Sequence, residues 1–339
     1  MAHYKYLIFL VYFAGFLFPQ KFPDPEIDKE LTEGVSLILN QKYAEAEDIF
    51  DRLDRAYPFN PLGKIYLSAV EIARSVDYGE PFNNSRITYL LEEAESLSDS
   101  LLDSDGENVW YKYYTALTSG YLAYYYALNE NYLVAFSEGL KSIKKFNECL
   151  ESDGSFYDAY IAIGTYRYWK SKKTDVLNFL PFYDDDTGNA IGLLKKAIDN
   201  NTYNNHLAIN SLIWIYIEEG KSREAIRLAK EELKKFPESR FFKWGLARAY
   251  EDVDKEEAIL TYQDILNSHL SRSGSNGYNE IILRHKIAML LHKLGKNDAA
   301  LENCRVILNT EINSEYVRTR LEDRLKRVKE LWDEMLSSN

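Results

Sequence analysis

Two histidines are the first candidates for chemistry in this chain. His285 and His292 lie seven positions apart, about two turns of a helix, so both imidazoles fall near one face. Such a pair can bind a metal or exchange protons, but no carboxylate or cysteine stands at the spacing that further ligands need. We interpret both as ordinary surface or groove histidines.

Other reactive residue types are present without the patterns that would make them sites. The Asp184–Asp186 run offers the carboxylates that Ca²⁺ prefers, but it lacks the EF-hand spacing with a distal glutamate. Cys149 and Cys304 fall far apart on expected helices and are interpreted as buried free thiols. Phosphate loops, nucleophile elbows and HExxH helices do not occur. The sequence therefore predicts a non-enzyme that holds no metal and no cofactor.

The elements that carry these residues repeat along the chain. Leu212 and Tyr216 recur 34 positions later as Leu246 and Tyr250. A period of this length is typical of solenoids built from pairs of helices. With 46% hydrophobic residues in 339 positions, the chain can bury a large core, and its few Gly and Pro suit helices joined by short turns.

The repeat signature resembles the tetratricopeptide repeat (TPR) family. Gly34, Ala46, Phe50 and Pro58 keep the family's offsets, and matches continue over most of residues 27 to 312. The resemblance implies an all-α fold, a right-handed superhelical solenoid of TPR-like helix-turn-helix repeats. Residues 60–128 keep helical periodicity without good signature positions, so the repeat register there is left open.

Two interruptions and a last helix complete the domain organisation. Within the repeat domain of residues 21–312 we expect an insert at 172–187 and a flexible surface loop at 268–278. Residues 313–339 are expected to form a capping helix, because one apolar stripe runs along them. The insert is apolar enough either to tuck into the solenoid or to dock a partner, through Phe179, Leu180, Pro181, Phe182 and Tyr183.

The N-terminus predicts export. Lys5 precedes an apolar run from Tyr6 to Phe18, which is the profile of a signal peptide over residues 1–20. We expect cleavage near Gln20 and an exported bacterial protein that is periplasmic or outer-membrane associated. The alternative is an uncleaved anchor, which would then be the protein's only membrane contact.

The resemblance implies that the binding surface is the concave wall of the array. In TPR proteins the first helix of each repeat, helix A, mainly lines this wall. Carried over by register, this wall comprises Thr165, Tyr168, Asn210, Trp214, Trp244, Arg248, His285, Met289 and His292. Trp and Arg commonly dominate binding energies, although Trp214 and Trp244 can equally pack between neighbouring helices. The 27 tyrosines, many of them between positions 109 and 128, are expected mostly to pack between helices.

Two functions remain open. The first is a non-catalytic interaction scaffold of the cell envelope that binds a peptide or protein partner in the concave groove. The alternative is an envelope protein that binds a small glycan-type ligand on aromatic faces, which should require a closed pocket with polar groups beside the rings. A net charge of −12 argues against a nucleic-acid partner. The sequence identifies neither the partner nor the oligomeric state.

Overall fold

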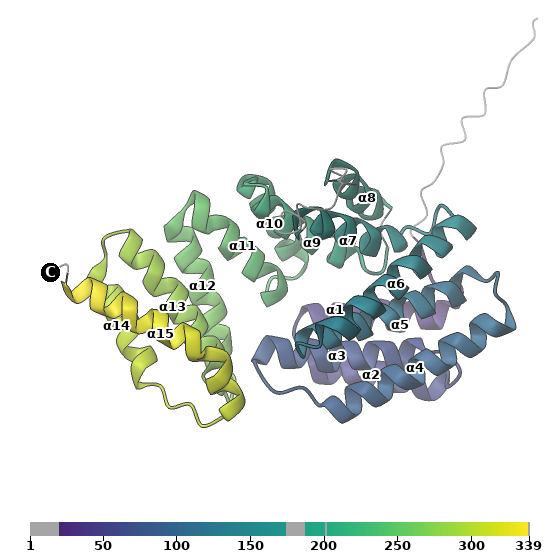
Figure 1. The fold of residues 1–339 in the computed structure, drawn as a ribbon, viewed down its shortest axis with the longest axis horizontal. Helices are drawn as coiled ribbons and strands as arrows, with labels where there is room; N and C mark the ends of the chain where they lie inside the picture. Colours follow the sequence, from purple (N-terminus) through teal and green to yellow (C-terminus); the bar gives the residue numbers. More distant parts are fainter. Residues whose placement is uncertain (1–19, 174–186, 201, 338–339) are drawn as a thin grey trace, which may run out of the picture.

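A computed structural model describes residues 20–173, 187–200 and 202–337. The expected all-α solenoid is confirmed, and Figure 1 shows its helices following one another in space from the N-terminal pairs through α7–α10 to α15. Most of the signal segment 1–20 and the whole of Phe179–Tyr183 lie outside the described residues. The described part contains α1 (Pro25–Leu39), α2 (Tyr43–Ala56), α3 (Leu62–Tyr78), α4 (Asn84–Ser104), α5 (Val109–Leu128), α6 (Tyr132–Ser152), α7 (Ala159–Lys173), α8 (Thr187–Asp199), α9 (Asn205–Glu218), α10 (Ser222–Lys235), α11 (Arg240–Val253), α12 (Lys255–Leu270), α13 (Tyr278–Lys293), α14 (Asn297–Asn309) and α15 (Glu315–Ser337).

Each odd-numbered helix up to α13 packs against the even-numbered helix that follows it. Four of these pairs are joined by the same turn, in which one residue has a positive φ: Gln41, Glu130, Gly220 or Gly295. After each of them a backbone N–H donates back to the carbonyl five residues earlier, which ends the first helix. The turn reverses the chain within a few residues, so the two helices of a pair lie antiparallel.

A glycine sets how closely the first two helices approach. Gly34 on α1 faces the ring of Phe50 on α2, and a Cβ added at Gly34 would lie 2.3 Å from Phe50 Cζ. The Phe50 ring in turn stacks on Tyr66 of α3, with ring centroids 5.0 Å apart. The signature positions Gly34 and Phe50 therefore meet as the repeat pattern predicts.

The expected capping helix is present as α15. Its apolar stripe is buried at Val317, Leu321, Val328 and Met335, where it covers the last helix pair, α13 and α14. The opposite side of α15 is rich in charged, exposed residues. This amphipathic helix closes the C-terminal end of the hydrophobic core.

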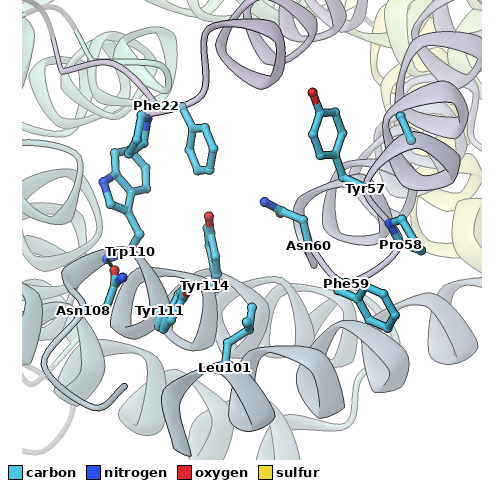
Figure 2. A pocket seen from close by; sticks show the side chains of 12 residues that line it. Phe22, Tyr57, Pro58, Phe59, Asn60, Leu101, Asn108, Trp110, Tyr111 and Tyr114 are labelled. Carbon is cyan, nitrogen blue, oxygen red and sulfur yellow. Dashed lines mark hydrogen bonds between the residues drawn. The ribbon is translucent and has the colours of Figure 1, made fainter. Parts of the chain in front are cut away.

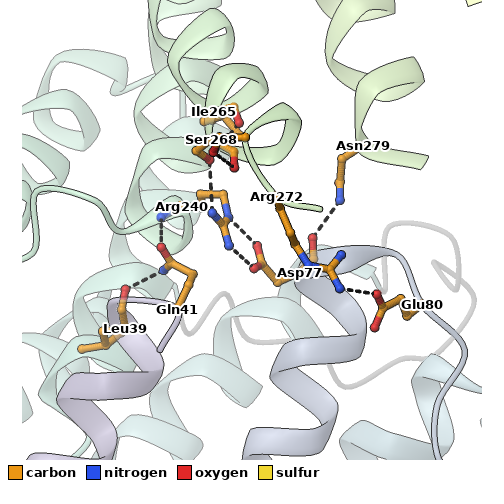
Figure 3. Close-up of polar contacts among 10 residues, drawn as sticks. Leu39, Gln41, Asp77, Glu80, Arg240, Ile265, Ser268, Arg272 and Asn279 are labelled. Carbon is orange, nitrogen blue, oxygen red and sulfur yellow. Dashed lines mark hydrogen bonds and ion pairs between the residues drawn. The ribbon is translucent and has the colours of Figure 1, made fainter. Parts of the chain in front are cut away.

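A set of polar contacts joins the end of α3 to the start of α11 and to the residues around the start of α13. We call these contacts the seam (Figure 3). The guanidinium of Arg240, at the start of α11, pairs with both carboxylate oxygens of Asp77 near the end of α3, with Nε 2.9 Å from Oδ1. Both side chains are nearly buried, at 10% and 12% exposure. Asn279 on α13 donates to the Asp77 carbonyl at 2.8 Å, and the Arg240 N–H donates to Gln41 Oε1 at 3.3 Å.

The segment after α12 belongs to the same seam, and the surface loop expected at 268–278 is shorter than predicted. Helix α12 continues to Leu270, which shortens the link. Arg272 pairs with Glu80 at 2.6 Å and lies 3.7 Å from the centre of the Tyr78 ring, while Asn276 donates to the carbonyl of Gly79 at 2.9 Å. Its small Ser and Gly residues allow the close approach to α3.

A second internal contact lies among the N-terminal helices. Tyr113 on α5 and Asn204 before α9 both donate to the carboxylate of Asp158, the latter at 2.8 Å, and Tyr66 on α3 donates to Asn204 Oδ1 at 3.4 Å. All four residues are buried. The inner face of α3 and α5 is therefore covered by the turns that precede α7 and α9 and does not line an open groove.

The contact at Gly34 predicts a large effect for one added methyl group. Gly34→Ala should lower the free energy of unfolding by about 1–3 kcal/mol, because the Cβ overlaps Phe50, and this outweighs the ~0.5–1 kcal/mol that Ala gains over Gly in a helix. Gly192→Ala on α8 is the matched control, since its Cβ meets nothing within 4 Å. Urea denaturation of both variants measures the difference, and equal midpoints would contradict the packing.

The seam predicts that removing one charge is costly. Asp77→Ala leaves the Arg240 guanidinium buried without its carboxylate and should lower the free energy of unfolding by about 3 kcal/mol. Glu45→Ala, which breaks the exposed pair with Lys42, should change it by less than about 1 kcal/mol. Denaturation measures both. An Asp77→Ala protein as stable as the Glu45→Ala control would refute the role of the seam.

Candidate functional site

The nine residues predicted for the concave wall differ in exposure. Trp214 and Met289 are exposed at 36% and 37%. Thr165, Asn210, Trp244, Arg248 and His292 are half-buried. Tyr168 and His285 are buried, at 0% and 3% exposure, so they do not belong to an accessible wall and their inclusion is corrected.

Both buried residues have structural partners that the repeat register does not reveal. Tyr168 on α7 donates to Glu219 Oε1 at 2.8 Å, at the end of α9. His285 Nδ1 lies 3.3 Å from a guanidinium nitrogen of Arg324 on α15, and another basic group, Arg327, is near. Burial, followed by these positive charges, lowers the pKa of His285 to about 4. It is a neutral core residue at pH 7.

Several of the remaining wall residues are also engaged by their neighbours. The Trp244 ring packs edge-on against Tyr262 on α12, with ring centroids 5.7 Å apart. Arg248 pairs with Asp252 at 3.1 Å on its own helix, and Thr165 donates to Ser211 on α9 at 3.0 Å. The indole of Trp244 therefore serves packing between helices, which leaves Trp214 and Met289 as the accessible apolar members of the predicted wall.

A different site, which we call the aromatic pocket, forms near the N-terminus (Figure 2). It is a cavity of about 500 Å³ between the segment before α1, the turn from α2 to α3, the end of α4 and the start of α5. Six of its lining residues are aromatic: Phe22, Tyr57, Phe59, Trp110, Tyr111 and Tyr114. The others are Pro23, Ala56, Pro58, Asn60, Leu101 and Asn108, so no lining residue carries a charge.

Local hydrogen bonds fix the three chain segments that bring these rings together. Asn108 is the N-cap of α5, and its Oδ1 accepts from the N–H of Trp110 at 3.0 Å. Asn60 Oδ1 accepts from the N–H of Leu62 at 3.0 Å and holds the turn before α3. The N–H of Phe22 donates to Asp28 Oδ1 at 2.9 Å, which ties the N-terminal segment to α1.

One side of the pocket is rigidly packed and the other is open. Phe22 meets Trp110 edge-on with centroids 4.8 Å apart, and Trp110 packs in the same way on Phe156 at 5.0 Å. Tyr57, Pro58 and Phe59 of the α2–α3 turn lie on the other side of the cavity (Figure 2). Phe59 is 79% exposed. The pocket thus combines a preformed aromatic wall with an uncovered phenyl ring.

The pocket is electrically neutral but lies beside carboxylates. Burial raises the pKa of Tyr114, so its hydroxyl stays protonated at neutral pH. Partial desolvation raises the pKa of Tyr57 as well, and the charges of Asp24, Glu26 and Glu30 raise it further. The rings and hydroxyls can therefore contact an apolar or weakly polar group, while a negative group nearby would be repelled.

Two other surface features are set apart from this pocket. A cavity of about 250 Å³ lies at the seam, but its arginines, Arg240 and Arg272, already pair with Asp77 and Glu80. The first turns of α6 leave apolar side chains uncovered, with exposures of 67%, 87%, 65% and 43% at Tyr132, Leu133, Phe136 and Leu140. Of these three features, the aromatic pocket alone combines a concave shape with a wall of aromatic rings and neutral polar groups.

The described residues contain no group of three or more His, Cys, Asp or Glu placed to hold a metal ion. Cys149 and Cys304 are free and buried, as the sequence predicted, and burial raises the pKa of the Cys304 thiol to about 11. Of the helices placed by the structure, none has the length and apolar character needed to cross a bilayer.

The aromatic pocket was missed by sequence reasoning because four separate segments build it. The tyrosine-rich stretch 109–128 predicts packing between helices, which holds for Tyr113 and Tyr114, both 2% exposed. Tyr111 is only half-buried. The usable signal was the pair Pro58–Phe59, since an apolar ring directly after a repeat's terminating proline has no place in the core.

Comparison with known proteins identifies the fold and not the function. The chain is similar to a solved structure of the Cut9–Hcn1 hetero-tetramer of APC/C, with a TM-score of 0.53, 17% identity, 91% of this chain covered and 52% of that chain. It is also similar to TTC0263, a TPR protein of Thermus thermophilus (TM-score 0.39, 14% identity, 65% and 97% covered). A TPR protein from Parabacteroides merdae gives a TM-score of 0.38 at 14% identity, with 92% and 100% covered.

No protein-family model and no curated protein matches the sequence. The likeness to solved structures, together with the repeat signature, shows that the chain has the TPR fold. Proteins of this fold typically act as interaction scaffolds rather than as enzymes.

The buried histidines predict acid sensitivity. The pKa values of His285 and His269 fall from about 6.5 to about 4 on folding, chiefly because both are buried. Below about pH 6.5 the unfolded chain binds protons that the folded chain does not, so stability present above that pH is lost as the pH falls toward 4.

Replacing His285 by Gln should flatten this dependence. Between pH 7 and pH 5 the free energy of unfolding should fall more in the wild type than in His285→Gln, by up to about 2 kcal/mol, as measured by urea denaturation at each pH. His292→Gln serves as the control, because that ring is half-exposed. Parallel curves for wild type and His285→Gln would show that the residue does not titrate as described.

Proposed function

We propose that this protein is a non-catalytic interaction scaffold that binds a segment of a partner protein in the aromatic pocket. The observation that carries the proposal is Phe59, whose phenyl ring is 79% exposed at the edge of an uncharged cavity lined by five further aromatic residues. Large aromatic side chains beside a packed wall are the usual anchors of protein interfaces. Phe59 contributes little to the core, so its apolar surface suits contact with a ligand.

The dimensions fit a short peptide segment. A cavity of about 500 Å³ accommodates a few side chains, and the hydroxyls of Tyr57 and Tyr111 and the amide of Asn60 can meet a peptide backbone. The wall formed by Phe22 and Trp110 is held by packing and by hydrogen bonds within the protein. A preformed wall lowers the ordering cost of binding.

We place this scaffold in a bacterial cell envelope. The support is the sequence of the first twenty residues, where Lys5 precedes the apolar run Tyr6–Phe18. Export to the periplasm, or association with the outer membrane, would expose the aromatic pocket to envelope partners. Detection of the protein in the periplasmic or outer-membrane fraction would support this location.

The pocket also favours a second candidate, a glycan-type ligand. Sugars stack on aromatic rings and hydrogen-bond to neutral side chains, and here Asn60 lies beside Tyr57 and Tyr114. The pocket is open on the Phe59 side, which suits a chain that passes through better than a small ligand that needs enclosure. We therefore rank the peptide first.

Both candidates make one testable prediction about Phe59. Peptide display on the immobilised protein should enrich a sequence class whose affinity falls about tenfold or more in Phe59→Ala, since an interface anchor typically contributes over about 1.4 kcal/mol. Phe136→Ala, at a ring that is 65% exposed on α6, is the matched control and should leave the affinity unchanged.

The outcomes separate the candidates. If no peptide class is enriched but oligosaccharides bind on a glycan array and are lost in Phe59→Ala, the glycan function replaces the scaffold. If ligands of either class bind equally well to wild type and Phe59→Ala, the aromatic pocket is not the binding site.

A further inference from the structure

We propose that the segment bound in the aromatic pocket is basic: an apolar Phe-Pro-type core flanked by Lys or Arg. This inference rests on the proposed function and names the chemistry of the partner. It follows from two observations on the same site, the way in which the protein holds its own Phe22-Pro23 and the distribution of charge around the pocket.

The N-terminal segment shows what this site accepts. Residues Gln20–Pro23 are not helical, and this segment packs against α5 through the ring of Phe22. The Phe22 ring is only 9% exposed, between Trp110 at 4.8 Å and Tyr114 at 6.3 Å between centroids. The side chain of Gln20 accepts the N–H of Asp158 at 3.0 Å. A Phe-Pro unit from the chain itself thus completes one wall, and the space next to it remains lined by the same ring types.

Carboxylates border this space on the side of α1. Glu26 is exposed, and Asp24 and Glu30 act with it on Tyr57 of the pocket. Glu30 pairs with Arg52 at 3.1 Å, but Asp24 uses its carboxylate only to accept backbone N–H groups at the start of α1. The charge of this edge is therefore negative.

A second acidic edge lies between α4 and α5. Asp103 at the end of α4 and Asp105 and Glu107 in the turn before α5 are all exposed, and they lie in sequence between the lining residues Leu101 and Asn108. Glu107 lies 3.7 Å from Lys112, a loose pair with a largely buried amine. Two exposed basic residues also adjoin the lining in sequence, Lys21 beside Phe22 and Arg55 beside Ala56, and Arg55 pairs with Asp51 at 2.9 Å. Carboxylates next to the lining segments at α1 and between α4 and α5 match a ligand that is apolar at its centre and positive at its ends.

The net charge of the whole molecule also favours a basic ligand. At a net charge of −12, the protein attracts cationic segments over a distance of about a Debye length and repels a second copy of itself. Contacts with an edge charge mainly raise the association rate, whereas the apolar core in the pocket sets the lifetime of the complex. Affinity for the basic segment should therefore depend on salt and on Phe59 separately.

The test uses fluorescent peptides with a central Phe-Pro and two Lys, two Ser or two Glu on each side, together with a Lys-flanked peptide in which Ser-Ser replaces Phe-Pro. Fluorescence anisotropy at about 50 mM and about 200 mM salt should rank the affinities Lys over Ser over Glu, with the difference shrinking at high salt. The Lys-flanked Ser-Ser peptide should bind at least about tenfold more weakly than its Phe-Pro counterpart.

Variants then separate the contribution of the acidic residues to affinity from that of the aromatic pocket. Glu26→Gln combined with Glu107→Gln should weaken the Lys-flanked Phe-Pro peptide about three- to tenfold and leave the Ser-flanked peptide unchanged. The control, Glu322→Gln with Glu330→Gln, removes the same charge from the exposed side of α15 and should have less than about a twofold effect. Phe59→Ala should weaken both Phe-Pro peptides.

Three results would overturn the inference. If the Ser-flanked peptide binds as tightly as the Lys-flanked one and depends on Phe59, the basic flanks are refuted while the scaffold function stands. If the Lys-flanked Ser-Ser peptide binds equally well, only non-specific charge attraction operates. If no Phe-Pro peptide binds, this ligand class is refuted, and the peptide display described above decides the proposed function independently.

Discussion

The buried pair between Arg240 and Asp77 is the contact on which the architecture depends. In an open repeat array each unit touches only its neighbours. Here the start of α11 reaches the end of α3 across 163 positions of sequence, and Asn279 and Arg272 add contacts to the same stretch of α3. Because a buried guanidinium without its carboxylate is costly, the pair stabilises the arrangement that brings α3 and α11 together. The second internal contact, around Asp158, fills the space among α3, α5 and the turn before α9.

This closure explains where the candidate site lies. A concave wall can bind a peptide only where it is empty, and the inner face of the N-terminal helices is occupied by the chain itself. The aromatic pocket is instead built at the N-terminal edge, where the turn from α2 to α3 and the segment before α1 meet the first turn of α5. A hydrogen bond from the N–H of Leu62 to Asn60 and the N-cap Asn108 hold these segments, so local contacts before α3 and α5 shape the pocket.

The sequence predicted the features that depend on residues close to one another in the chain. The signature positions Gly34 and Phe50, which contact each other, and the apolar stripe of α15 follow from residues within one repeat or one helix. Register alone could not show that Tyr168 is covered or that Arg324 would lie against His285, because these contacts join different helices. The aromatic pocket and the seam are harder still. Each needs the superhelical curvature, which small rotations between successive helix pairs determine and which no local pattern specifies.

The seam also bears on how such a protein can change over generations. Repeat proteins commonly gain or lose units by duplication or deletion of a helix pair, since an added pair simply extends the array. A pair inserted between Asp77 and Arg240 would rotate and shift every later helix, and it would separate two charged groups that are nearly buried against each other in this arrangement. The pair between Asp77 and Arg240 thus constrains the number of helix pairs between α3 and α11. It places no such constraint on the part of the chain from α14 onward.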